Sequence, residues 1–182
     1  MSKELLEIER LLAENDISAG YLSANEDFSM PQLLVDFSLS GESEELAQKN
    51  DALTLQICHI PVPDSSVFIL QFFVQLPMPP PFQPDAEVPA FLVGGLQKYI
   101  AHLNQVLPII GFNSSQQDLY FRSSLVLEKY SEAQLLYYFE LLIHLLQVCL
   151  PALQAVAIGL EDPDEAIANI QNIFTAQEND DA

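Results

Sequence analysis

The fold of this chain is decided by residues 107–173, which read LPIIGFNSSQQDLYFRSSLVLEKYSEAQLLYYFELLIHLLQVCLPALQAVAIGLEDPDEAIANIQNI. Apolar and polar residues alternate on both sides of the turn Ser114-Ser115-Gln116-Gln117, and a period of two is typical of β-strands. We therefore predict a hairpin of Ile109–Asn113 and Leu119–Leu127, followed by two helices. This stretch indicates an architecture and contains no catalytic or cofactor signature.

The segment from Leu141 to Leu160 approaches the length and apolarity of a membrane span. Its polar residues recur at intervals of four, three, four and three, so a helix would bring them onto one narrow face. The sequence therefore predicts an amphipathic core helix rather than a membrane span. The residues of this polar stripe are Glu140, His144, Gln147, Pro151 and Gln154.

Capping residues set the ends of the two predicted helices. Ser131 with Gln134 three residues later forms a capping box, and Gly159 supplies a C-terminal stop. Pro151 is predicted to bend the long helix or to divide it. The second helix begins with the N-terminal residues Asp162, Pro163 and Glu165, and its inward face is predicted to carry Ile167, Ile170, Ile173 and Phe174.

The first half of the chain adds helices and strands around a polar connector that extends to about Met30. Leucines and Ile8 between residues 5 and 12 indicate a first helix, and proline suits the first turn of another that begins near Pro89. Period-two segments predict strands over Leu33–Leu39, Leu53–Cys58 and Val67–Leu76. The expected fold is α+β, with an antiparallel sheet of about five strands in the order α-β-β-β-α-β-β-α and an additional C-terminal helix.

The strand Val67–Leu76 differs from the other predicted strands because both of its faces are apolar. Ile69 and Phe73 lie on the face opposite Phe68 and its neighbours, so cover is needed on both sides. A central position in the sheet or a binding partner would provide that cover.

The segment from Pro77 to Pro84 contains five prolines, which favour a stiff loop over a domain linker. A recognition sequence for a proline-binding module is the alternative. Downstream, Gly94-Gly95 lacks a preceding strand and a following Lys-Ser/Thr, so close helix packing is expected there instead of phosphate binding.

Composition bounds the class of protein. The 182 residues are 49% hydrophobic and carry a net charge of -20 from 26 acidic residues against 6 Lys and Arg. Such a chain is expected to form one domain, here residues 1–176 with an acidic flexible tail over 177–182. The charge argues against nucleic acid and anionic membranes as partners. It is compatible with solubility alone and with attraction to a basic partner.

The N-terminal segment Met1–Arg10 interleaves charges with leucines and so lacks the apolar core of a secretory signal. Cys58 and Cys149 are the two cysteines of the chain. They are expected to be buried thiols of a reducing compartment, although a disulfide is possible. We expect a cytoplasmic protein.

The residues Ile110-Gly111-Phe112-Asn113, the strand LYFRSSL over 119–125, and the segments Leu150–Leu153 and Ala157–Gly159 resemble the YbjN family. The domain of that family is similar to the class I type III secretion chaperone fold. The resemblance covers roughly residues 5–160 and implies a homodimer. The proline-rich segment Pro77–Pro84 and the helix after Gly159 depart from a minimal chaperone-like domain.

Candidate catalytic constellations fail on geometry. Cys58 and His59 are adjacent in a strand, so their side chains point to opposite faces. Glu140 and His144 could supply two metal ligands four residues apart, but no third ligand has a suitable spacing. The acids at 162, 164 and 165 have the arrangement of a helix N-terminus. We predict no catalytic residue, no cofactor and no metal, and therefore a protein that is not an enzyme.

The expected function is a protein-binding or chaperone-like regulatory module that offers an apolar sheet surface or a strand edge to a protein or peptide partner. The alternative is an enzyme or small-molecule binder with a pocket near the proline-rich loop. Arg122, one of six cations, is expected either to pair with a neighbouring carboxylate or to grip a partner. The predicted partner-binding residues are Val67, Ile69, Phe73, Tyr120 and Arg122.

Overall fold

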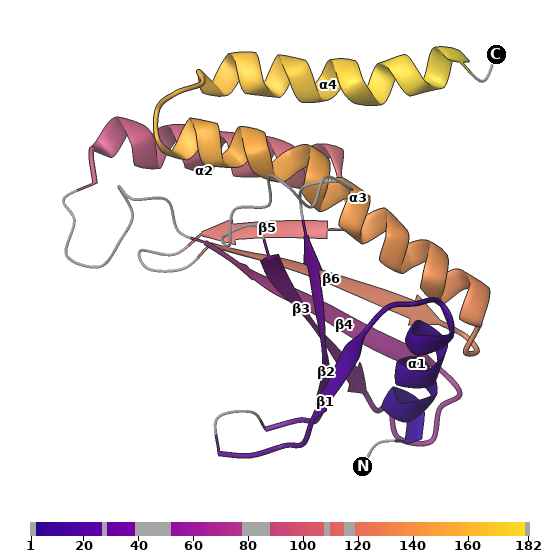
Figure 1. Ribbon diagram of the computed structural model, residues 1–182. Helices are drawn as coiled ribbons and strands as arrows, with labels where there is room; N and C mark the ends of the chain where they lie inside the picture. The colour runs from indigo at the N-terminus through magenta and orange to yellow at the C-terminus, as the bar shows by residue number, and fades with distance from the viewer. Residues whose placement is uncertain are drawn as a thin grey trace. The chain divides into compact units, whose positions relative to one another are not determined.

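The computed structural model describes residues 3–26, 29–38, 52–77, 88–107, 110–114 and 119–180. The acidic loop 41–45, the prolines from 79 to 84 and the turn residues 115–117 lie outside these ranges, as do the side chains beyond residue 173. Within the described residues, the chain forms four helices and six strands (Figure 1). In chain order they are α1 (Lys3–Glu14), β1 (Ala19–Leu22), β2 (Gln32–Ser38), β3 (Ala52–Ile60), β4 (Phe68–Leu76), α2 (Ala90–Val106), β5 (Ile110–Ser114), β6 (Leu119–Leu127), α3 (Glu132–Ala157) and α4 (Pro163–Asp180).

The fold is α+β with an antiparallel six-stranded sheet, which confirms the predicted class. The strand order is β1-β2-β3-β4-β6-β5. Strand β4 therefore lies inside the sheet between β3 and β6. Its even-numbered residues Phe68 to Leu76 are buried, whereas Ile69 and Phe73 on the opposite face are only half-buried.

Two compact units make up the chain. Unit 1 comprises Met1–Leu76 with Tyr120–His144, and unit 2 comprises Pro77–Leu119 with Leu145–Ala182. Single-domain organisation over residues 1–176 and a flexible tail after residue 176 stay predictions. Helix α4 continues to Asp180, four residues into the predicted tail.

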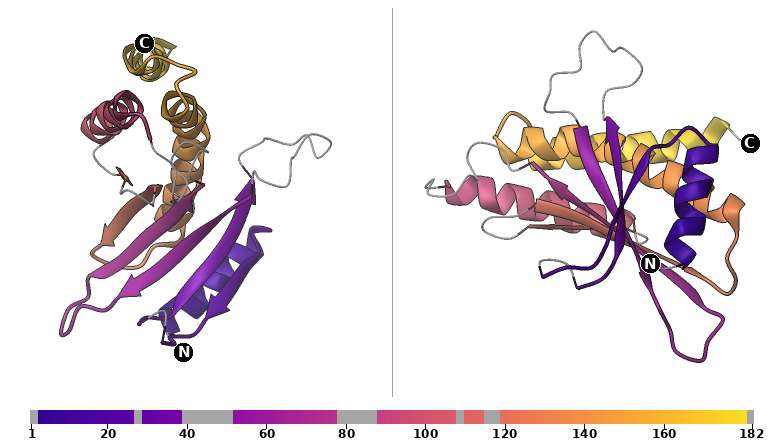
Figure 2. Two further views of the ribbon diagram at one scale, coloured as in Figure 1. Left: turned by 90° about the vertical axis from the view of Figure 1, so that its left-hand side faces the viewer. Right: turned by 60° about the horizontal axis from the view of Figure 1, so that its bottom comes forward.

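In unit 1, helix α1 packs against β1, β2 and β3 (Figures 1 and 2). Its buried residues Leu5, Ile8, Leu11 and Leu12 follow the helical spacing that the sequence predicts. The first part of α3 reaches the same core, where the rings of Tyr138 and Phe72 lie 5.4 Å apart. These contacts bury one face of the sheet, which we call the inner face.

The inner face is built from alternate residues of each strand. The register pairs Leu55 with Val74 and Ile57 with Phe72, so these side chains share one side of the sheet. Hydrophobic burial of this kind contributes roughly 25 cal/mol per Å2 of apolar surface. The most fully buried members of the inner face in unit 1 are Leu33, Val35, Leu55, Ile57, Leu70, Phe72, Val74 and Phe121.

In unit 2, helices α2 and α4 lie side by side, as the end-on view of Figure 2 shows. Gly95 permits this contact, because a Cβ atom there would lie only 3.0 Å from Cγ of Pro163. The expected role of Gly95 in close helix packing is therefore confirmed, whereas Gly94 faces open space. Asn104 of α2 forms two hydrogen bonds with the backbone of Phe112 in β5. Its Nδ2 donates to the Phe112 carbonyl oxygen and its Oδ1 accepts from the Phe112 N–H, both at 2.8 Å.

The structure differs from the sequence prediction in two elements. Residues 19–22, which we assigned to the polar connector, form strand β1 and pair with β2, which raises the strand number from about five to six. A four-residue strand with no fully buried side chain is too short for a period-two signal. Pro151 lies inside α3, which is one helix, so the predicted division is wrong and the alternative of a bend stays a prediction. Pro151 is exposed, so its ring faces away from the core.

Helix α3 is the one described helix that is long and apolar enough to cross a membrane. Its predicted polar stripe is present, because Glu140, His144 and Pro151 are exposed while Leu142, Leu146 and other apolar residues are fully buried. A share of 44% of its most apolar window is buried inside the fold. The helix is therefore amphipathic, with a buried apolar side and an exposed side that carries Glu140, His144 and Pro151.

Candidate functional site

The side of the unit 1 sheet opposite the inner face, which we call the outer face, combines apolar, aromatic and polar side chains. The contacts of α1 and α3 with the sheet described above involve the inner face. Most side chains of the outer face are half-buried, because each packs against side chains of the neighbouring strands. Its members on β2, β3, β4 and β6 include Gln32, Leu34, Gln56, Cys58, Ile69, Gln71, Phe73, Tyr120 and Arg122.

Strand register arranges these side chains in rows that cross the sheet. In the aromatic row, Leu34 pairs with Gln56 and Gln56 with Phe73. The rings of Phe73 and Tyr120 then lie 5.4 Å apart with an angle of 30° between their planes. A tilted contact at this distance is favourable for two aromatic rings.

A polar row lies next to the aromatic row. Gln32 pairs with Cys58, and Cys58 pairs with Gln71. Arg122 of β6 is the last member of this row. When the amide oxygen of Gln71 faces the guanidinium group, it accepts hydrogen bonds from Arg122 Nε at 2.6 Å and Nη2 at 2.5 Å. The polar row therefore ends on a cation that is held in place by a neutral side chain.

The expected carboxylate partner of Arg122 is not found among the described residues. Its contact in the structure is Gln71, and the ion pairs of the described residues involve other side chains. The reason lies in the topology, because β6 lies beside β4 and the sequences of β3, β4 and β6 contain no acidic residue. Arg122 is also exposed, so its charge remains hydrated.

The structure brings four of the five predicted partner-binding residues onto one surface. Ile69, Phe73, Tyr120 and Arg122 all lie on the outer face of the neighbouring strands β4 and β6. Val67 precedes β4, and its backbone N–H donates to Ser65 Oγ at 3.0 Å, so it belongs to the turn before the strand.

Sequence reasoning missed the polar part of this surface. Gln32 is only 3% exposed, and its Nε2 has no hydrogen-bond partner among the described residues. Its Oε1 lies 3.8 Å from the Cys58 sulfur. The period-two pattern of β2 places Gln32 and Leu34 on one face, but only the register with β3 and β4 shows that they share it with Gln71 and its neighbours.

The two side chains of the Cys58-His59 pair point to opposite faces, as predicted. Cys58 belongs to the outer face, where partial burial raises the pKa of its thiol. His59 stacks on Phe68 at 4.9 Å, and its Nδ1 lies 3.9 Å from Glu4 of helix α1. The expectation of two buried thiols needs one correction: Cys149 is buried, but Cys58 is only half-buried.

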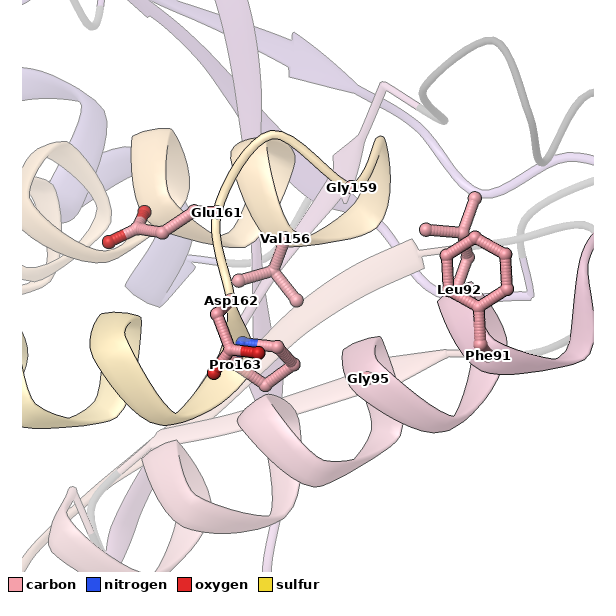
Figure 3. Close-up of a pocket in the computed structure, with 8 residues that line it drawn as sticks. All are labelled: Phe91, Leu92, Gly95, Val156, Gly159, Glu161, Asp162 and Pro163. Carbon is pink, nitrogen blue, oxygen red and sulfur yellow. The ribbon is translucent and has the colours of Figure 1, made fainter.

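Unit 2 contains a cavity of about 230 Å3 at the start of α2 (Figure 3). Its wall is mainly apolar, and Phe91 on its rim is 75% exposed. The lining residues are Phe91, Leu92, Gly95, Val156, Gly159, Glu161, Asp162 and Pro163.

Both acidic residues of this cavity have structural partners. Asp162 Oδ1 accepts a hydrogen bond from the backbone N–H of Asp164 at 2.8 Å and so caps α4, as predicted. Glu161 Oε1 accepts from Asn169 Nδ2 at 3.1 Å. Chemically, the cavity therefore presents an apolar wall beside two carboxylates that already hold the α4 N-terminus.

Comparison of the chain with protein-family models, curated proteins and solved structures gave no significant match. The resemblance to the YbjN family stays a prediction. Among the residues that the structure describes, no three His, Cys, Asp or Glu side chains cluster as a metal site would require.

Proposed function

We propose that this protein is a non-enzymatic protein-binding module, chaperone-like or regulatory, and that the outer face of unit 1 is its binding surface. The observation that carries the proposal is the aromatic row, in which Leu34, Phe73 and Tyr120 are aligned across the strands on the face opposite the one that α1 and the first part of α3 cover. Interfaces are enriched in Tyr, Phe and Arg, and this face presents all three. We further propose a cytoplasmic homodimer that uses neither nucleic acid nor membrane as a partner.

The kinds of side chain on the outer face support a polypeptide as its ligand. Half-buried aliphatic and aromatic side chains provide contact area, and the amides Gln56 and Gln71 can bond to a peptide backbone. An extended chain matches such a surface, because its own side chains repeat at the same spacing as those of the sheet.

The test is to select peptides from a random library on the wild-type protein and to measure their affinities for variants. Ile69→Ser with Phe73→Ser should weaken binding at least tenfold at every salt concentration, because hydrophobic contacts govern the lifetime of a complex. Phe91→Ser is the matched control, since it removes an exposed phenylalanine from unit 2. Circular dichroism verifies that each variant is folded.

A second variant keeps the test independent of core packing. Ser124 is exposed on the outer face of β6, so Ser124→Tyr adds bulk to the surface without removing a buried group. It should also weaken binding at least tenfold. Unchanged affinity in both outer-face variants, or failure of the library to yield a ligand, contradicts the proposal.

The alternative is small-molecule binding in the cavity of unit 2, which an apolar wall and an exposed aromatic rim favour. In that case Phe91→Ser, and not the outer-face variants, would abolish ligand binding. The same set of variants therefore separates the two functions.

A further inference from the structure

Among the residues that the structure describes, no carboxylate forms an ion pair with Arg122, although the chain is strongly acidic. Lys3, Arg10 and Lys98 each lie within 4.0 Å of a carboxylate, whereas Arg122 contacts the neutral Gln71. Asp36 on β2 is an acidic residue of the outer face, as its pairing with Thr54 of β3 shows. Its Oδ1 accepts a hydrogen bond from Thr54 Oγ1 at 2.6 Å.

Distance prevents Asp36 from neutralising Arg122. Strand β2 is separated from β6 by β3 and β4, and neighbouring strands are about 4.8 Å apart, which gives a separation of roughly 14 Å. This separation exceeds the screening length of about 8 Å at physiological ionic strength. Counting the described side chains alone, the centre of the outer face is therefore positive, although the whole chain carries a charge of -20.

The guanidinium of Arg122 is oriented by its contact with Gln71. That contact uses Nε and one hydrogen of Nη2, and an arginine has five N–H donors. The remaining donors include the parallel pair on Nη1 and Nη2, which matches the two oxygens of a carboxylate. Because Arg122 is exposed, this pair is accessible to a ligand.

Apolar groups lie on both sides of Arg122 along the strand direction. The contacts of Phe73 with Tyr120 and of Gln71 with Arg122 give β4 and β6 a common register. On the other side of the Gln71 level, Ile69 pairs with Ile60. Successive levels are two residues apart, or about 6.8 Å, which is also the spacing of residues i and i+2 in an extended peptide.

Building on the proposed function, we propose that the outer face binds an extended peptide segment that presents an internal Asp or Glu side chain to Arg122, between apolar side chains at i-2 and i+2. The apolar levels on both sides favour an internal carboxylate over a C-terminal one, since the peptide must continue in both directions. The overall acidity of the chain would favour a basic ligand, but the group at the point of contact is a cation.

The test uses three synthetic peptides with acetylated N-termini and amidated C-termini. Each contains Phe, a central residue and Ile in that order, with a Thr between successive members. The central residue is Glu, Gln or Lys, and affinity is measured by fluorescence anisotropy at physiological salt. The Glu peptide should bind about tenfold more tightly than the Gln peptide, and the Lys peptide should bind most weakly. Arg122→Gln should remove the preference for Glu, and Arg122→Lys should retain only part of it.

Lys129→Gln is the matched control, because it removes an exposed cation just after β6 and should leave the preference unchanged. Equal binding of the Glu and Gln peptides, or tighter binding of the Lys peptide, overturns this inference and leaves the proposed function standing. If none of the three peptides binds, the inference fails, and the library selection described above decides whether the proposed function stands. If only a peptide with a free C-terminus binds, the carboxylate is terminal and the inference of an internal acid is wrong.

Discussion

Ser123 on β6 and Tyr138 on α3 join the sheet to the helix through a buried hydrogen bond, with their hydroxyl oxygens 2.5 Å apart. Ser123 is 4% exposed and Tyr138 9%, so the pair lies in the core of unit 1. Tyr138 Oη also donates to the carbonyl oxygen of Ser124 at 3.2 Å. The hydroxyl of Ser123, a polar group on the inner face of β6, thus finds a hydrogen-bond partner in a tyrosine 15 residues later in the chain.

The first prediction concerns this pair. Tyr138→Phe should lower the free energy of unfolding by about 1–2 kcal/mol, because it removes a partner from the buried Ser123 hydroxyl. Ser123→Ala in the same background should cost less than it does alone, since the two hydroxyls act as a unit. A double-mutant cycle by urea denaturation measures the coupling, and additive effects would show that the hydrogen bond contributes nothing.

The second prediction concerns Gly159, which ends α3 with φ of +74°. A Cβ atom at this position would lie 2.9 Å from Cδ2 of Leu92. Gly159→Ala should therefore destabilise the protein by about 1–2 kcal/mol through backbone strain and contact with Leu92.

Gly94 supplies the control for Gly159, because it is exposed inside α2 and its Cβ would meet no atom within 4 Å. Gly94→Ala should stabilise the protein by about 0.5–1 kcal/mol, as alanine loses less entropy in a helix. Thermal unfolding of both variants tests the pair, and a shift of the same sign in each would contradict it.

The third prediction concerns the α4 cap. Asp162→Ala should cost about 1 kcal/mol because the Asp164 N–H loses its acceptor, whereas Asp162→Asn should retain most of the cap. Hydrogen exchange at the Asp164 amide gives a local measurement. Equal protection in the wild type and the alanine variant would show that the side chain does not cap the helix.

The fourth prediction concerns pH. Burial raises the pKa of the Cys149 thiol to about 12, well above the value of about 8.5 in an unfolded chain. Between these values the folded state keeps a proton that the unfolded state loses, so stability falls as pH rises. The free energy of unfolding should drop by about 1 kcal/mol more between pH 8 and 9.5 in the wild type than in Cys149→Ala. Parallel pH profiles would contradict this result.

Local patterns were sufficient to predict most of the secondary structure. The period-two segments became β2, β3, β4 and β6, and Ser131 Oγ accepts from the Gln134 N–H at 3.4 Å where the capping box predicts the start of α3. Asp162 and Gly159 likewise mark helix ends as expected. Strand β1 was missed because Ala19–Leu22 is short and lacks a buried alternating set.

The sequence by itself determined which residues lie on each face of each strand, because the side chains of an extended chain alternate with a period that depends only on local geometry. It could not determine which strands are neighbours. Strand β6 lies beside β4, although the residues that meet are about 50 positions apart in the chain. This neighbourhood brings Gln71 into contact with Arg122 and Phe73 into contact with Tyr120. Only tertiary structure decides such pairings, because register is fixed by the packing of all inner-face side chains together, and the composition of the outer face follows from that register.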